Sequence, residues 1–339
     1  MAIRHLHRFA ALALTLAAAG VSAQTITLKV HHFLPPSSTA HAKIITPWCD
    51  TIAKESGGRL KCQIYPSMQM GGTPPQLFDQ AKDGVADIIW TVPGYQAGRF
   101  PVSESFELPF MVHDSERASR GLWHYAMKNA TAEFKGVKPI LFHVHDGALL
   151  HTSKRQVKAL EDFRGLKVRA PTRLGTKMVA ALGATPVPMP LPQAAEALSK
   201  GVIDGVMIPW EAVPTLKFEE VAHYHAEIPA NAPQMLNVVF IFAMDQAKYD
   251  SLPPDLKKVI DANSGADRSA WAGRIFSESS AIGRKSAEAR KNTFHTLPDA
   301  ELKRWITATG QIDDEWVKDM SAKGFDGKRL LDEAKAACK

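Results

Sequence analysis

The sequence predicts an α/β protein of two lobes, each a mostly parallel sheet flanked by helices. Its 339 residues are 45% hydrophobic and 22% charged, which is typical of soluble globular proteins, and the chain is too long for one small core. Strand patterns alternate with helix patterns along much of the chain, as in parallel sheets covered on both faces. A Gly-Val-x-Asp pattern occurs at 84–87 and again at 201–204, each time between a predicted helix and a predicted strand. This repeat indicates two similar lobes.

Residues 1–23 have the organisation of a secretory signal peptide. Arg4 and Arg8 precede an apolar run over 9–19, and Val-Ser-Ala at 21–23 forms a small-x-small cleavage site. The run is too short to span a bilayer. We therefore expect cleavage between Ala23 and Gln24 and a mature protein outside the cytoplasm. The net charge of +6 is modest and acids are interleaved throughout the chain, so we expect no nucleic-acid partner.

The first lobe is predicted to begin with a strand over 25–33, which stops at Pro35 and Pro36. A helix capped by Ser37 or Ser38 follows, with apolar residues spaced for one face, and it ends at the glycines 57–58. Strands over 60–65 and 85–91 flank a helix over 76–82. This order of elements predicts a sheet with its helices in the crossovers.

The second block is predicted to hold strands over 140–145, 167–170, 185–189 and 203–208, with helices over 172–182 and from 193 onward. A strand over 236–243 precedes a mostly helical tail. In that tail, 267–290 is expected to form a helix of roughly 35 Å, long enough to cross both lobes. We therefore assign 24–146 and a return segment, 235–274, to the first lobe, and 147–234 with 275–339 to the second.

Sequence signatures of common enzymes are absent: there is no GxSxG, GxGxxG, Walker A or HExxH motif. His143 and His145 lie two apart on a predicted strand and share a face, so a secreted metal-dependent hydrolase is the alternative hypothesis. No second cluster supplies further ligands, so we expect no metal and no cofactor. Cys49, Cys62 and Cys338 indicate neither a disulfide framework nor a CxxC site. Cys49 and Cys62 either pair or remain two buried thiols.

Three residues at strand ends favour a binding function. Arg169 ends an apolar strand, so its guanidinium is expected at the carboxyl edge of the sheet, where open α/β sheets bind ligands. Its fork matches a carboxylate with two parallel hydrogen bonds, although a surface salt bridge is the alternative. Trp90 and Trp210 lie at or just past a strand end in each copy of the repeat. They are expected either to face each other across an interlobe cleft or to lie in the core.

Several segments resemble the periplasmic solute-binding proteins of TRAP (tripartite ATP-independent periplasmic) transporters. They are 70–72 (Met-Gly-Gly), the two Gly-Val-x-Asp turns, 98–101 with 107–110, 162–171 and 183–189. The likeness covers essentially the whole mature chain, and the run ending in Arg169-Ala170-Pro171 is among its most specific parts. The resemblance implies a two-lobe periplasmic binding protein fold that closes on an organic acid. It also implies that Arg169 pairs with the ligand carboxylate and that membrane permease subunits are the partner.

Two departures from the sialic-acid-binding branch of that family narrow the expected ligand. Leu149 stands where that branch has a second arginine, and Ile208 corresponds to an asparagine that helps hold the carboxylate. Because the hydroxyls of a sugar acid are costly to bury without partners, we expect a small apolar monocarboxylate, such as an aromatic or branched 2-hydroxy or 2-oxo acid.

The expected ligand-binding residues come from both lobes. They are Arg169, the walls Trp90, Trp210 and Phe33, the secondary candidates Arg173 and Asn237, and His145 as a hydrogen-bond partner of a hydroxyl or keto oxygen. We expect a monomeric transport protein rather than an enzyme, and a non-transport ligand sensor is a further alternative.

Overall fold

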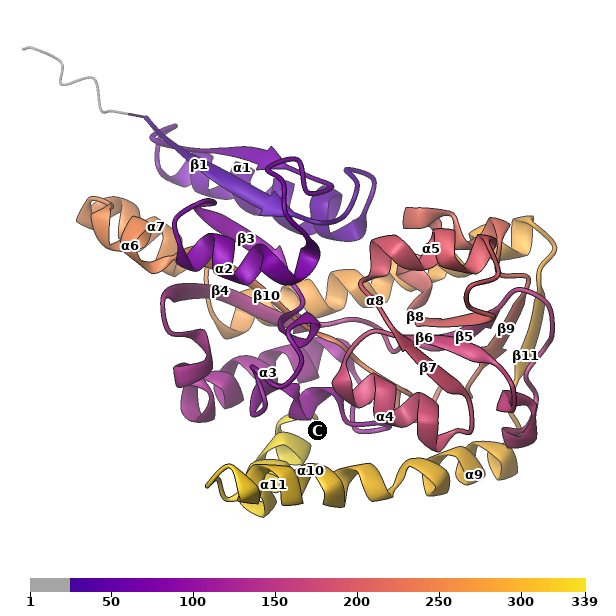
Figure 1. The fold of residues 1–339 in the computed structure, drawn as a ribbon. Helices are drawn as coiled ribbons and strands as arrows, with labels where there is room; N and C mark the ends of the chain where they lie inside the picture. Colours follow the sequence, from indigo (N-terminus) through magenta and orange to yellow (C-terminus); the bar gives the residue numbers. More distant parts are fainter. Residues whose placement is uncertain (1–24) are drawn as a thin grey trace, which may run out of the picture.

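The computed structural model describes residues 25–339 and confirms the predicted α/β class, with two sheets flanked by helices (Figure 1). The predicted signal peptide lies outside the described residues. The first sheet has five strands in the order β2-β1-β3-β10-β4, and the second has six in the order β11-β9-β5-β8-β6-β7. The chain passes between the sheets after β4 and again before β10, so the lobes are joined by more than one crossing. The residue boundaries assigned to the lobes stay a prediction.

The first sheet combines parallel strands with one reversed strand. β1 (Ile26–His32) pairs in parallel with β2 (Leu60–Tyr65) and β3 (Ile88–Thr91). β10 (Val239–Asp245) returns from the second lobe and lies antiparallel between β3 and β4 (Val137–Val144). Every residue of β3 and β10 is buried, and each strand is apolar except for its last residue.

The second sheet contains three short strands that the sequence patterns did not predict. β6 (Lys167–Ala170) pairs in parallel with β7 (Thr185–Pro188) and β8 (Gly205–Ile208), as expected. The unpredicted strands are β5 (Leu149–Thr152), β9 (Tyr224–Glu227) and β11 (Thr293–Thr296). Each has only four residues and at least two polar side chains among them, so its pairing rather than its own sequence makes it a strand. Both β8 and β9 are antiparallel to β5, so this sheet is mixed.

The predicted long helix is confirmed as α8 (Ala266–Ala289), which runs along both lobes (Figure 1). Its buried face consists mostly of small residues, and two glycines permit close backbone approach. A Cβ atom at Gly273 would lie 2.2 Å from the carbonyl oxygen of Ser115, at the start of α3 (Ser115–Asn129). A Cβ atom at Gly283 would lie 1.7 Å from the carbonyl oxygen of Trp210 in the second lobe. The helix therefore packs directly on the backbone of both lobes.

The remaining helices cover the sheets. A π-helical turn, η1 (Ala40–Ile45), leads into α1 (Thr46–Glu55), and α2 (Leu77–Lys82) precedes β3. The second lobe carries α4 (Arg173–Ala181) and α5 (Leu191–Ser199), while α6 (Gln246–Ser251) and α7 (Pro254–Ala262) follow β10. The tail comprises α9 (Asp299–Thr309), α10 (Gln311–Ala322) and α11 (Gly327–Ala337). It runs back to the first lobe, where Glu333 on α11 pairs with Lys128 on α3 at 3.0 Å.

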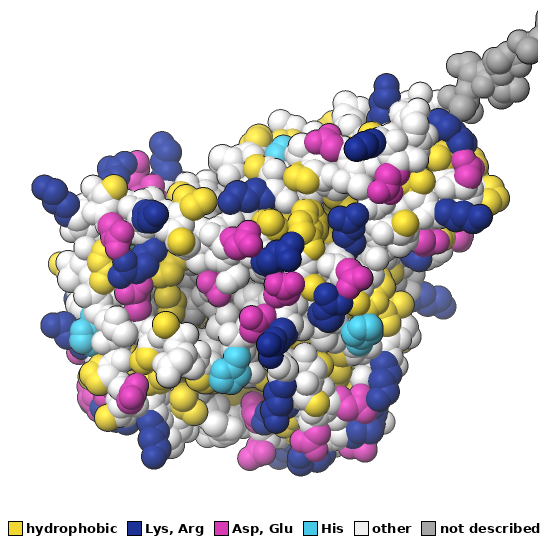
Figure 2. All heavy atoms as spheres, turned by 180° about the vertical axis from the view of Figure 1, so that it is seen from behind, with side chains coloured by type: hydrophobic (Ala, Val, Ile, Leu, Met, Phe, Trp, Pro, Cys, Tyr) yellow, Lys and Arg dark blue, Asp and Glu magenta, His cyan; other side chains and the backbone are white. Residues whose placement is uncertain are grey.

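The open question about the cysteines is settled by a disulfide between Cys49 and Cys62, which joins α1 to β2, while Cys338 is a buried free thiol. Among residues 25–339, no helix has the length and apolar composition needed to cross a membrane. Acidic and basic side chains are interspersed over the face shown in Figure 2.

Candidate ligand-binding site

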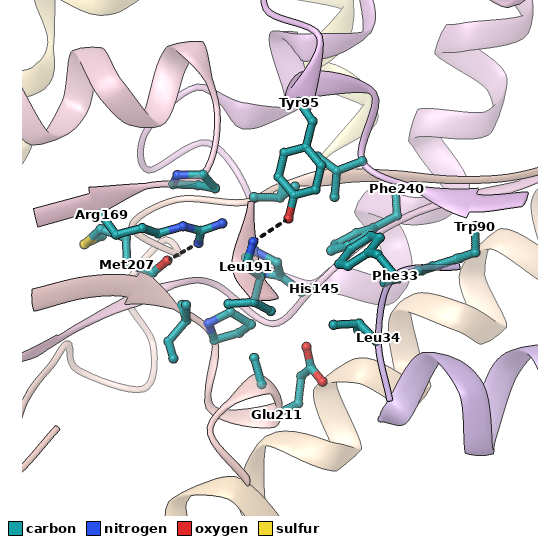
Figure 3. A pocket seen from close by; sticks show the side chains of 16 residues that line it. Phe33, Leu34, Trp90, Tyr95, His145, Arg169, Leu191, Met207, Glu211 and Phe240 are labelled. Carbon is teal, nitrogen blue, oxygen red and sulfur yellow. Dashed lines mark hydrogen bonds between the residues drawn. The ribbon is translucent and has the colours of Figure 1, made fainter. Parts of the chain in front are cut away.

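A cavity lies between the lobes, where strand ends from both sheets meet (Figure 3). The space among its lining residues amounts to about 420 Å³, part of it open to solvent. Apolar side chains form most of its wall, among them Phe33, Leu34, Val92, Leu191, Val238 and Phe240. The few polar groups among them are therefore the ones that orient a ligand.

Arg169 reaches the cavity from β6 and is only 3% exposed (Figure 3). Its Nε donates to the carbonyl oxygen of Met189 at 2.9 Å, and its Nη1 donates to that of Met207 at 3.1 Å. A guanidinium has five N–H donors, so Nη2 and part of Nη1 remain for a ligand. Burial lowers the pKa of Arg169, and within the described residues no carboxylate pairs with it. A buried cation without an anion is costly, and a ligand carboxylate supplies that anion.

Tyr95 adds a hydroxyl beside this guanidinium and comes from the other lobe. It ends the short helix η3 (Pro93–Tyr95), and its Oη accepts a hydrogen bond from the backbone N–H of Leu191 at 3.1 Å. Burial raises the pKa of Tyr95, and the nearby charge of Arg169 opposes that rise without cancelling it. The phenol therefore keeps its proton, and its O–H can donate a hydrogen bond to a carboxylate. Sequence reasoning missed Tyr95, although its position just past β3 is the same signal that identified Trp90.

Stacked aromatic rings form the wall contributed by the first lobe. The ring centroids of Phe33 and Trp90 are 5.1 Å apart, and those of Trp90 and Phe240 are 4.8 Å apart at an interplanar angle of 13°. Trp90 is fully buried, and its Nε1 donates to Nε2 of His143 at 3.0 Å. Phe33 and Trp90 thus line the cavity as expected, and they offer a ligand a flat apolar surface.

His145 also lines the cavity and is 2% exposed. Burial is the main cause that lowers its pKa to about 3, and the charges of His143 and Arg169 add to the effect. The imidazole is therefore neutral. Its Nδ1 has no hydrogen-bond partner within the described residues. Asn237 does not line the cavity; its Nδ2 donates to the carbonyl oxygen of His145 at 2.7 Å, which fixes the backbone there.

Two predicted site residues lie elsewhere. Trp210 packs within the second lobe against His151, with ring centroids 4.8 Å apart and an interplanar angle of 80°. The chain turns at the end of β8, and this turn directs the neighbouring residue, Glu211, into the cavity instead. The expectation that Trp90 and Trp210 face each other was therefore wrong. Arg173 pairs with Glu104 of the first lobe and, at 2.8 Å, with Asp319 on α10. It is occupied by protein carboxylates and does not reach the cavity.

Of the two histidines in the alternative hydrolase hypothesis, His143 has structural partners for both ring nitrogens, whereas Nδ1 of His145 has none within the described residues. His143 accepts a hydrogen bond from Trp90, and its Nδ1 lies 3.2 Å from the carbonyl oxygen of Val144. In the part of the chain that the structure describes, no group of three His, Cys, Asp or Glu residues could hold a metal ion. The arrangement gives the hydrolase hypothesis no support.

Solved structures similar to this chain are solute-binding proteins of TRAP transporters. One, from Rhodoferax ferrireducens T118 in complex with copurified benzoate, is 46% identical with a TM-score of 0.91 and covers 93% of this chain and 98% of its own. Another, from a marine metagenome and specific for aromatic acid ligands, binds 3-hydroxybenzoate and is 40% identical, with a TM-score of 0.91 and coverage of 93% and 98%. A third, from Bordetella bronchiseptica with bound (R)- and (S)-mandelate, is 26% identical, with a TM-score of 0.85 and coverage of 92% and 98%.

The family comparison agrees with the resemblance in the sequence. The family model of bacterial extracellular solute-binding protein, family 7, matches residues 30–319, which is most of the chain. Together with the two-lobe fold and the cavity between the lobes, this match means that the chain belongs to bacterial extracellular solute-binding protein family 7, the solute-binding proteins of TRAP transporters.

Proposed function

We propose that this protein captures an aromatic monocarboxylate in the periplasm and delivers it to a TRAP permease, without acting as an enzyme. The observation that carries the proposal is Arg169, a buried cation that has no acid partner among the described residues and stands beside an aromatic wall. An aromatic acid matches both features because its carboxylate neutralises the guanidinium and its ring packs on Phe33 and Phe240.

The apolar wall explains why an aromatic ring is favoured over a polyhydroxylated chain. A phenyl ring removes on the order of 150 Å² of apolar surface from water, worth about 4 kcal/mol at about 25 cal/mol per Å². Leu149 lies outside this cavity, but Ile208 lines it and offers no polar side-chain contact. The hydroxyls of a sugar acid would lose their water without gaining partners here. The bound benzoate and 3-hydroxybenzoate of the two similar structures support the same ligand class.

The site is assembled from both lobes, so binding is coupled to their closure. Tyr95 of the first lobe meets the backbone of Leu191 in the second, and Arg173 joins the second lobe to Glu104 in the first. We expect the lobes to open about their connecting segments when the cavity is empty and to close around the ligand, which excludes water from the ion pair. Small-angle scattering should then give a smaller radius of gyration with saturating ligand.

A panel of acids tests the ligand class by isothermal titration calorimetry and thermal shift. It comprises benzoate, 3-hydroxybenzoate, mandelate, lactate, succinate and sialic acid. Aromatic acids should bind most tightly, and a ligand at 100 times its Kd should add about 2.7 kcal/mol of stability. The ligand should be recovered unchanged, with the same affinity after treatment with a chelator. Tight binding of sialic acid or succinate without a response to any aromatic acid would overturn the proposed ligand class.

A further inference from the structure

Glu211 is a carboxyl group in the cavity wall that neither the ion pair with a ligand nor the aromatic packing uses. It lies on η7 (Trp210–Ala212), just after β8, and is 8% exposed. Figure 3 shows its carboxyl directed into the cavity, on the side of Leu34 rather than of Arg169. A ligand held by Arg169 therefore presents its ring, and not its carboxylate, to Glu211.

The surroundings of Glu211 keep it uncharged. Within residues 25–339 no lysine, arginine or histidine forms an ion pair with it, and Lys43, whose charge acts on it, donates to Ser279 at 2.9 Å instead. Burial raises the pKa of Glu211 to about 8, the charge of Asp146 adds to that rise, and the Thr39 hydroxyl and Lys43 oppose it. The group is therefore a carboxylic acid near neutral pH, with one O–H donor and a carbonyl acceptor.

A carboxylic acid in an apolar cavity needs polar partners, and the Thr39 hydroxyl satisfies only part of its capacity. An unsubstituted phenyl ring offers no hydrogen-bonding group to this acid. A hydroxyl on the ring can donate to the carbonyl oxygen of the acid and accept from its O–H, and neutral His145 lines the same cavity. We propose that Glu211 is the specificity-determining residue that selects aromatic monocarboxylates carrying a ring hydroxyl away from the carboxylate. This inference rests on the proposed function.

The position of the hydroxyl provides an internal control. In 2-hydroxybenzoate the hydroxyl lies next to the carboxylate, so it stays at the Arg169 end of the cavity. In 3- or 4-hydroxybenzoate it extends away from that end, toward Glu211. The proposal therefore separates isomers of the same size and charge.

Calorimetry with the mature protein tests the assignment, using benzoate and its 2-, 3- and 4-hydroxy derivatives. The wild type should bind 3- or 4-hydroxybenzoate at least about tenfold more tightly than benzoate or 2-hydroxybenzoate, a difference of about 1.4 kcal/mol. Glu211→Leu should bring that ratio close to one, and Glu211→Gln, which keeps a donor and an acceptor, should retain most of it.

A matched variant separates ligand selection from a structural contact. Thr39→Val removes the first-lobe hydroxyl beside Glu211, and it should change the affinities for all four acids by the same factor. If Glu211 only joins the lobes through Thr39, Glu211→Leu will behave in the same uniform way, and the proposal is overturned. A wild type without preference for the 3- or 4-hydroxy isomer overturns it even if Glu211→Leu does not fold. Failure of all four acids to bind would overturn the proposed function as well.

Discussion

Replacing Arg169 by methionine removes the one cation that lines the cavity among the described residues, while it keeps a side chain of similar length. Two effects on the ligand-free protein oppose each other. The carbonyl oxygens of Met189 and Met207 lose their donor, which costs about 1–3 kcal/mol for each group left unsatisfied. The variant also loses a buried charge that has no counterion, and the burial of that charge costs the wild type several kcal/mol. We therefore expect the melting temperature of the ligand-free variant to stay close to that of the wild type.

The ligand-bound protein has no such compensation. A benzoate carboxylate buried against apolar walls without its guanidinium should lose about 2–5 kcal/mol of binding free energy, or about 30- to 5,000-fold in Kd. At a concentration of 100 times the wild-type Kd, the ligand stabilises the wild type by about 2.7 kcal/mol. A hundredfold weaker variant gains only about 0.4 kcal/mol under the same conditions. Arg169→Lys should also bind weakly because an ammonium cannot replace the planar fork.

Calorimetry measures these affinities, and thermal melts without ligand show that each variant is folded. Lys167→Met is the matched control, since Lys167 lies on the same strand, carries the same charge and is exposed. It should bind benzoate as the wild type does. An Arg169→Met protein that melts normally and still binds benzoate with wild-type affinity would refute the role of this guanidinium.

Three further predictions concern closure, the disulfide and pH. A Cβ at Gly94 would lie 2.7 Å from Cγ2 of Thr172 across the cleft, so Gly94→Ala should weaken benzoate binding about tenfold in calorimetry. Thr172→Ser removes that methyl group and should restore part of the affinity in the double variant, since Cβ of Thr172 and Oε1 of Glu107 would each still lie 3.2 Å from the new Cβ. Full affinity in Gly94→Ala alone would contradict this reading. Replacing both Cys49 and Cys62, which are 13 residues apart, by alanine should lower the free energy of unfolding by about 3 kcal/mol in urea without changing benzoate affinity. Without ligand, the free energy of unfolding should peak near pH 6.5, about the ordinary pKa of histidine. Three histidines whose pKa burial lowers to about 3 bind protons on unfolding, so the fold loses stability as the pH falls below 6.5, and they outweigh the two carboxyls whose pKa burial raises to about 8. Above pH 6.5 only these carboxyls still release protons on unfolding, so stability falls as the pH rises toward 8 (His32, His143, His145, Glu107 and Glu211). A free energy of unfolding that rises steadily from pH 6.5 to pH 8.5 in urea titrations would contradict this prediction.

The sequence by itself determined the fold class, the family and the positions of two residues that line the cavity, Arg169 and Trp90. Helix and strand periodicity is local, so α8 and most strands could be predicted from consecutive residues. Arg169 and Trp90 could be placed because the carboxyl ends of parallel strands meet at one edge, which makes position along a strand sufficient to indicate the ligand side. The short strands β5, β9 and β11 could not be predicted from the sequence, because their pairing partners are distant along the chain.

Only the tertiary structure decided which side chains turn into the cavity. Trp210 and Glu211 are neighbours just past the same strand, and the turn at η7 places the tryptophan against His151 and the acid in the cavity. Arg173 was a secondary candidate because it begins an element near the same sheet edge as Arg169, but it pairs with Glu104, which comes from the other lobe. Tyr95 likewise joins the site through a contact with distant Leu191. The charge state and direction of a side chain depend on which segments fold against it, and no local pattern encodes that.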